Sequence, residues 1–147
     1  MRCVVQKVNY ASVTVDKKLV NEIKRGLMVL VGFTHDDTIE DIKYCVKKVA
    51  KLRVFEDEND VMNLSVLDVK GEVLSISQFT LYGDVRGGNR PSYIEALGGE
   101  KAKPMYEEFN RQLNELVPTY DGIFGADMKV ELLNDGPTTI IIDSKIR

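Results

Sequence analysis

The sequence has few of the residues on which conventional enzyme chemistry depends. Its 147 residues include one histidine, two cysteines and no tryptophan. A Ser-His-Asp triad or a Cys-His pair would have to use His35, and nothing in the spacing around it supports either arrangement. No His, Cys and carboxylate cluster has the spacing of a metal site, so we expect no metal and no cofactor. An enzyme with this sequence must act mainly through positioning, backbone donors and groups on its substrate.

A long apolar run and a strong excess of positive charge are also missing. The longest apolar run, Leu27 to Phe33, is too short to span a bilayer. The formal net charge of −3 argues against general attraction to phosphates, although a local basic rim is compatible with it. Cys3 and Cys45 lack a C-x-x-C spacing and are expected to be buried thiols in a reducing compartment. We therefore expect a cytoplasmic protein that does not contact a membrane.

Length and hydrophobic patterning predict one domain over residues 1–147, in the α+β class. Helices are expected over 38–51, where Thr38 and Asp41 have the spacing of a capping box, and over 101–117, before Pro118. His35 precedes the first helix and is expected to be solvated or to cap it. The expected strands are 2–8, 12–15, 18–23, 27–33, 52–55, 63–69, 73–81, 128–133 and 138–143, with the last two forming a hairpin around 134–137.

Two loops carry charged residues without a specific binding pattern. The acidic loop 56–60 lacks the ligand alternation of a calcium loop and is expected to be a solvated turn. Arg86 and Arg90 lie on a glycine-containing loop that could grip a phosphate, but a solvated surface loop is the favoured interpretation.

The strand expected from Val73 to Leu81 places Ser77, Gln78 and Thr80 within an otherwise apolar run. A buried hydroxyl or amide without a partner costs about 1–3 kcal/mol, so these groups need partners. The residue types leave two interpretations open. Either the polar groups bind neighbouring backbone in a structural strand, or they bind a ligand.

The segment Ser77–Leu81, taken with Asn134–Thr139, resembles the pair of signature motifs of the D-aminoacyl-tRNA deacylases. The likeness continues in Met62–Leu64, Asn89–Ser92 and Gly125–Met128. Two motifs in order and at the right separation are highly specific. The resemblance implies a homodimer of α+β subunits, each with a strongly twisted, barrel-like, mostly antiparallel β-sheet assembly and two helices.

The implied reaction is hydrolysis of the ester that joins a D-amino acid to the acceptor end of tRNA, at an active site in the subunit interface. In the family, a cis Gly-Pro peptide reaches into the partner subunit's pocket, which assigns chiral selectivity to Gly136 and Pro137. Rigid carbonyl groups there would bind the substrate's ammonium group and leave no room for an L side chain. Because glycine has no side chain, glycyl-tRNA is expected to be accepted as well.

The resemblance also assigns the residues of the pocket. Ser77, Gln78, Phe79 and Thr80 would line it, and Met128 would form part of its wall. Catalysis would rest on Gln78, Phe79 and Thr80, mainly through positioning and backbone donors for the ester carbonyl or its oxyanion. Phe79 could also orient the terminal adenosine. The hydroxyl of Thr80 is a weak nucleophile without a base, so we expect the 2′-hydroxyl of the terminal ribose to help activate water.

Two residues depart from the family pattern. Lys7 stands where arginine is usual, which keeps the charge but loses the planar fork, and Thr138 replaces an aliphatic residue after Gly-Pro. Both are expected to affect how firmly the Gly-Pro segment is held. Two other functions stay open: a catalytically inactive RNA- or protein-binding module on the same fold, and a hydrolase of small esters or amides with Thr80 as nucleophile.

Overall fold

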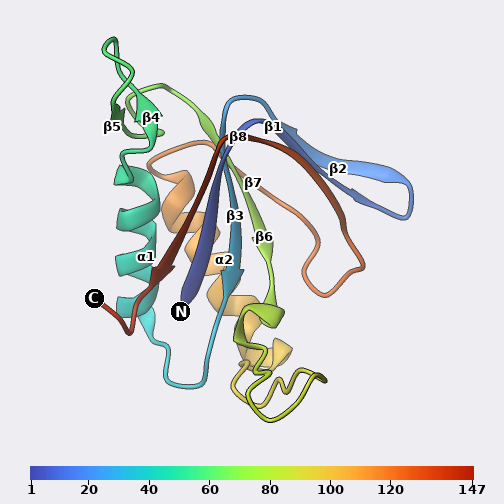
Figure 1. The fold of residues 1–147 in the computed structure, drawn as a ribbon. Coiled ribbons are helices and arrows are strands. Elements are labelled where there is room, and N and C mark those ends of the chain that lie inside the picture. The colour runs from blue at the N-terminus through green and yellow to red at the C-terminus, as the bar shows by residue number, and fades with distance from the viewer.

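The computed structural model describes residues 1–147 and shows a strongly curved β-sheet with two helices (Figure 1). The main sheet has the strand order β2-β1-β3-β6-β7, with β8 paired to β1, while β4 and β5 form a separate ribbon. No helix has the length and hydropathy needed to cross a membrane. The elements are β1 (Arg2–Val15), β2 (Lys18–Ile23), β3 (Gly26–Gly32), α1 (Ile39–Lys51), β4 (Phe55–Glu56), β5 (Met62–Leu64), β6 (Glu72–Ser77), the 3-10 helix η1 (Phe79–Tyr82), α2 (Gly99–Asn114), β7 (Thr119–Asp121) and β8 (Lys129–Asp143).

Strand β1 connects the two halves of the sheet. It pairs antiparallel with β3 through its first half, with β2 through its second half, and with β8 along both. The pairs β3–β6 and β6–β7 are parallel. Figure 1 shows β1 and β8 as long curved strands that run side by side. The result is a nearly closed, barrel-like mixed sheet with two helices, which confirms the expected fold class.

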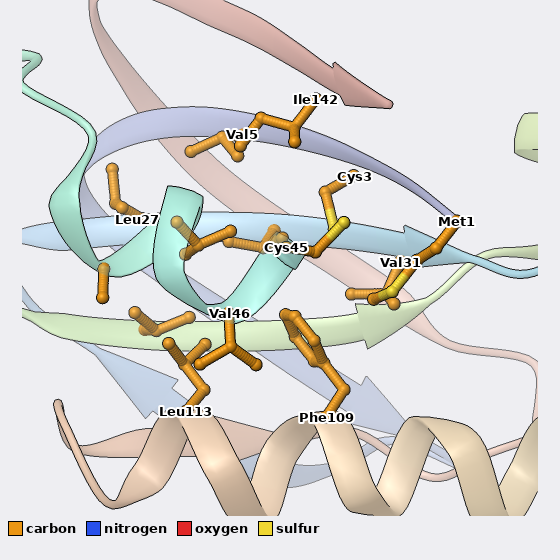
Figure 2. Packing of buried hydrophobic residues seen from close by; sticks show 14 of the residues in the cluster. Met1, Cys3, Val5, Leu27, Val31, Cys45, Val46, Phe109, Leu113 and Ile142 are labelled. Carbon is orange, nitrogen blue, oxygen red and sulfur yellow. The ribbon is translucent and has the colours of Figure 1, made fainter. Parts of the chain in front are cut away.

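Both faces of β3 and β6 are buried, by two separate hydrophobic clusters. The larger one lies between the sheet and the helices. Figure 2 shows Val46 of α1 beside Leu113 of α2, both facing the strands of the sheet. The smaller cluster covers the opposite face and includes Met28. Burial on both faces explains why β3 is continuously apolar, since a parallel strand between two layers has no solvated side.

The helices are close to their expected positions. The side chain of Thr38 accepts a hydrogen bond from the amide of Glu40, and Asp41 accepts one from the amide of Thr38 at 2.8 Å, which completes the expected capping box. Helix α2 begins two residues earlier than expected and ends at Asn114. The thiols of Cys3 and Cys45 are buried and free, as expected.

The expected hairpin around residues 134–137 is wrong. Residues 129–143 form the single strand β8, just as residues 2–15 form the single strand β1. Gln6 pairs with Thr139 and Val8 pairs with Asn134, so residues 135–138 bulge out of β8 opposite Lys7. Asn, Asp, Gly and Pro are favoured in such a bulge as well as in the turn of a hairpin, so the sequence pattern fits both structures. We call residues 135–138 the Gly-Pro bulge.

The central strand also ends earlier than expected. Strand β6 stops at Ser77, and Phe79 begins the 3-10 helix η1. The partner strand β3 ends at Gly32, so no further ladder is available beyond this point. Ser77 and Gln78 are therefore half-buried and Thr80 is exposed. Their polar groups do not incur the free-energy cost of burial that a longer, buried strand would impose. In place of the strands expected at 52–55 and 63–69, the structure has the shorter strands β4 and β5, each extending one residue beyond the expected bounds, and β7 is an additional strand.

Candidate active site

A pocket of about 580 Å³ opens at the carboxyl ends of β3 and β6. These strands are parallel and pair Val31 with Ser77, so they end at the same edge of the sheet. The start of α2, with Gly98 and Gly99, and the segment 124–128 form the other walls. Twelve of the 19 lining residues are hydrophobic, which suits a largely apolar group fixed by a few polar contacts.

Four of the residues expected in the pocket line it: Ser77, Gln78, Phe79 and Met128. Thr80 does not line the pocket. Its hydroxyl accepts a hydrogen bond from the side-chain amide of Gln78, and the residue is exposed. The structure therefore brings the residues around η1 together and leaves the Thr80 side chain at the rim.

One of the backbone donors expected near this pocket is already occupied. The amide of Gln78 donates to the carbonyl of Val31 at 2.7 Å, so it is occupied. Phe79 and Thr80 open η1, and the first amides of a helix have no acceptor within that helix. The amides of Phe79 and Thr80 are consequently the backbone donors of this segment without a backbone acceptor.

An aromatic contact joins η1 to the loop that forms one wall. The rings of Phe79 and Tyr93 meet edge to face at 5.0 Å between centroids. His35 donates through Nε2 to the carbonyl of Ile94 at 2.7 Å, and the Thr34 hydroxyl donates to the carbonyl of Glu95 at 2.6 Å. His35 thus holds this loop, a role that its place in the sequence did not suggest.

The pocket contains little ionisable chemistry. Its one carboxylate belongs to Asp127, which is exposed and lies 3.1 Å from the ammonium group of Lys129. No histidine, cysteine or lysine lines it. No group of three or more His, Cys, Asp or Glu side chains in the structure is arranged to hold a metal ion. A reaction in this pocket would depend on amide donors, shape and the substrate's own groups.

Tyr93, Gly98, Gly99 and Phe124 also line the pocket, and the sequence analysis did not assign them to it. They come from three segments that are distant in sequence from Ser77. No local sequence pattern marks these residues. Gly98 and Gly99 at the start of α2 do not mark a close approach of backbone, since a Cβ at Gly98 would meet no atom within 4 Å and one at Gly99 only the Phe124 ring.

The peptide between Gly136 and Pro137 is cis, and both residues are exposed. Neither of them lines the pocket of its own chain. Val130 is the only residue of β8 that does, and Gly136 lies six residue steps further along this strand, which corresponds to about 20 Å. The two halves of the expected site are therefore apart within one chain.

The Gly-Pro bulge is closed by the side chain of Asn134. Its Oδ1 accepts from the amide of Thr138 at 2.7 Å, and its Nδ2 donates to the carbonyl of Thr138 and the hydroxyl of Thr139, both at 3.2 Å. Gly136 has φ +137°, and a Cβ there would overlap the side chain of Thr138. Lys7 does not take part in this clamp. Its buried side chain extends to Glu56, with 3.8 Å between Nζ and Oε1.

Comparison with known proteins identifies the family. Residues 4–143 match the sequence profile of the D-Tyr-tRNA(Tyr) deacylases. The chain belongs to this family. It is 60% identical over 146 residues to a D-aminoacyl-tRNA deacylase of Clostridium novyi, covering 99% of this chain and 98% of that protein. It is 56% identical to a D-aminoacyl-tRNA deacylase of Fusobacterium nucleatum, covering 99% of this chain and 97% of that protein.

Solved structures have the same fold. A structure named c-Myc DNA Unwinding Element Binding Protein is 41% identical, with a TM-score of 0.93 over 97% of this chain and 98% of that one. The structure of a probable eukaryotic D-amino acid tRNA deacylase is 17% identical in sequence. It matches with a TM-score of 0.83, covering 96% of this chain and 97% of that one, and at this identity it shows that the fold is similar. Membership in the D-Tyr-tRNA(Tyr) deacylase family confirms the resemblance drawn from the two motifs and the expected class, a hydrolase of the D-aminoacyl-tRNA ester.

Proposed function

We propose that the chain hydrolyses D-aminoacyl-tRNA at a site made from two subunits, in which the Gly-Pro bulge of one subunit enters the pocket of the other. The observation that carries this proposal is the separation of two exposed features in one chain. The pocket beside η1 is open, and the bulge projects from β8 about 20 Å of strand away. A second copy of the chain would bring the two together.

The free edge of β8 supports a homodimer. This strand pairs with β1 alone, so its other edge has no partner in the chain. Leu133, Ile140 and Ile141 on either side of the bulge are 51%, 37% and 68% exposed. An unpaired strand edge with exposed aliphatic side chains is a surface that association buries. In a two-fold dimer each bulge would serve the other subunit's pocket, which gives two equivalent sites.

Substrate selection in this site follows from the backbone of the bulge. The carbonyl groups of Gly136 and Pro137 accept hydrogen bonds from the substrate's ammonium group, and the Asn134 clamp keeps them in place. With the ammonium group fixed, an L side chain would point into this rigid backbone, whereas a D side chain points away from it. Selectivity is thus obtained by rejection. Glycyl-tRNA carries no side chain to reject, so we propose that it is a second substrate.

The pocket side supplies orientation and charge stabilisation. Phe79 holds the terminal adenosine, and Ser77, Gln78 and Met128 shape the space for the amino acid. The 2′-hydroxyl of the terminal ribose helps to deprotonate a water molecule, whose oxygen bonds to the ester carbon. The carbonyl oxygen becomes an oxyanion held by the amides of Phe79 and Thr80. The bond to the ribose oxygen then breaks, and that oxygen takes a proton to give tRNA and free D-amino acid.

A hydrolase with Thr80 as nucleophile has less support. Such a nucleophile needs a neighbouring base, and the hydrogen-bond partner of its hydroxyl is the Gln78 amide, which is a donor. The lone histidine is bound to the carbonyl of Ile94. We therefore treat the Thr80 side chain as a positioning group and its amide as the catalytic one.

A binding module without catalysis is the second candidate function. One specific observation favours it, since the name of the 41% identical structure describes a protein that binds a DNA element. The absence of an ionisable base from the pocket is compatible with both candidates. We also propose that residues 1–147 act as one domain and work in the cytoplasm, where the buried thiols of Cys3 and Cys45 would stay reduced.

The experiment that separates these candidates measures amino acid release from matched D-tyrosyl-tRNA and L-tyrosyl-tRNA, with a chelator present. We expect rapid loss of the D-ester, slow release from D-tyrosyl-tRNA without protein, and an unchanged L-ester. If neither ester is hydrolysed but tRNA is bound, the binding-module candidate is correct. Hydrolysis of both esters would contradict rejection by Gly136 and Pro137.

A further inference from the structure

The outward face of α1 carries a group of positive charges that the reaction does not use. The cations Lys47, Lys48, Lys51 and Arg53 line a hollow of about 350 Å³ together with Tyr44 and Leu52. None of these residues lines the pocket beside η1. Arg147 joins them, because its guanidinium group lies 4.5 Å from the centre of the Tyr44 ring. We call these five cations and Tyr44 the α1 basic surface.

These cations have no carboxylate partners, unlike other cations close to them. Lys43 on the same helix pairs with Glu40, and Lys145 pairs with Asp37 and Asp41. No carboxylate oxygen lies within 4 Å of any of the five cations of the α1 basic surface. In a protein whose net charge is −3, this leaves a local positive region available to an anionic partner.

The fold holds the group in one place. Ile42, Val46 and Val49 direct one side of α1 into the core, so the lysines of the opposite side face outward: Lys47, Lys48 and Lys51. Arg53 donates to the backbone carbonyl of Asn63 at 3.0 Å, and Arg147 donates to that of Ser144 at 2.9 Å. These bonds leave both guanidinium groups charged and fix their positions beside the hollow.

A ring among the cations gives the surface a second property. Tyr44 lies half-buried beneath Arg147, and Lys48 Nζ is 5.7 Å from the centre of its ring. Lys47, Lys48 and Lys51 occupy about one turn of helix, or roughly 6 Å along its axis. Closely spaced cations around an aromatic ring fit a chain of phosphates better than they fit a single carboxylate, because a polyanion contacts several cations at once.

We propose that the α1 basic surface binds the phosphodiester backbone of tRNA, at a part of the molecule beyond the acceptor end. This inference rests on the proposed function, which supplies the RNA, and it adds a second contact outside the pocket. Binding there neutralises charges that otherwise repel one another, and it raises affinity for the whole tRNA without changing the reaction at the ester. An acidic protein or lipid surface is the competing occupant that the test must exclude.

The first arm of the test measures binding of uncharged tRNA over a range of salt concentrations. The variant Lys48→Gln with Lys51→Gln removes two cations and keeps residues that favour helix. The control Lys17→Gln with Lys18→Gln removes two exposed, unpaired cations where the β1–β2 turn leads into β2. We expect the test variant to raise the Kd on the order of ten-fold at 0.1 M salt and to lower the salt slope by about two. Equal effects of both variants, or none, would overturn the inference.

The second arm measures deacylation of two substrates, D-tyrosyl-tRNA and a short D-tyrosylated oligonucleotide ending in CCA. We expect the test variant to raise KM for the full tRNA and to leave the short substrate unaffected, with kcat unchanged for both. A raised KM for both substrates would overturn the inference. If the wild-type protein hydrolyses neither substrate, the proposed function fails, while the binding arm still decides the inference. Lys47→Gln with Arg147→Gln provides a second pair if the first lowers the Tm.

Discussion

The side chain of Asn134 binds both backbone polar groups of Thr138, accepting from its amide at 2.7 Å and donating to its carbonyl at 3.2 Å. These two bonds bridge the base of the Gly-Pro bulge, in which residues 135–137 are exposed and Thr138 is buried. A side-chain amide can do this because it combines an acceptor and a donor in one plane. The position of Gly136 and Pro137 therefore depends on Asn134, which precedes them by two and three residues.

Replacing Asn134 by alanine should loosen the bulge. Loss of its hydrogen bonds should lower the free energy of unfolding by about 1–3 kcal/mol. Because chiral rejection requires a rigid bulge, the ratio of D-ester to L-ester hydrolysis should fall as well. Urea unfolding and paired ester assays measure the two effects. Asn59→Ala is the control, since its exposed side chain makes no hydrogen bond in the acidic loop. An unchanged D-to-L ratio in Asn134→Ala would contradict the positioning role.

Replacing Gly136 by alanine should be more damaging to activity. The φ of +137° disfavours a side chain, and the added Cβ would overlap Thr138. We expect loss of most D-tyrosyl-tRNA hydrolysis, measured as kcat/KM. Gly87→Ala is the matched control, because a Cβ at Gly87 meets no atom within 4 Å. Full activity in Gly136→Ala would mean that the bulge does not contact substrate.

Replacing Thr80 by alanine should leave most of the activity. The backbone amide is retained, and only a hydroxyl that binds the Gln78 side chain is lost. We expect kcat to fall by less than about ten-fold, whereas loss of a true nucleophile typically removes several orders of magnitude. Single-turnover rates with D-tyrosyl-tRNA measure this difference. A fall of a thousand-fold or more would favour the Thr80 hydrolase instead.

Acid stability should depend on Asp41. Burial acts to raise the pKa of this carboxyl, but hydrogen bonds from Ser144, Thr38 and Lys145 outweigh it and hold the pKa well below the ordinary 3.8. A depressed folded pKa means that the stabilisation is present above about pH 4 and is lost as the pH falls below that value. Tm measured from pH 7 to pH 3 should therefore fall less steeply in Asp41→Asn than in the wild type. Asp60→Asn, at an exposed position, should keep the wild-type slope.

The sequence predicted much of this fold because its strongest patterns are local. The capping box at Thr38 and the continuous burial of β3 follow from residue spacing alone. The run after Val73 was misread because strand propensity continues to Leu81, whereas the ladder ends with the partner strand at Gly32. Pairing partners decide where a strand stops, and no local pattern specifies them.

The same distinction applies to the site. Ser77, Gln78 and Phe79 lie together on one segment and were found from a motif, whereas Tyr93 and Phe124 reach the pocket through the packing of distant loops. The bulge at Gly136 was misread as a hairpin because its turn residues fit both structures. Only the long pairing of β8 with β1 distinguishes them. The occupied amide of Gln78 likewise depends on a bond to β3.

The most direct test of a site shared between subunits uses a mixed dimer. One subunit carries Ser77→Trp, which places a large side chain at a half-buried position lining the pocket, and the other carries Gly136→Ala. Each variant alone should be inactive as a homodimer. In the mixed dimer, purified through a different tag on each subunit, one pocket and one bulge remain intact and face each other. We predict about half of the wild-type rate on D-tyrosyl-tRNA, because one of two equivalent sites is whole. No activity in the mixed dimer, with both subunits folded and paired, would contradict the account, since each chain would then use its own bulge.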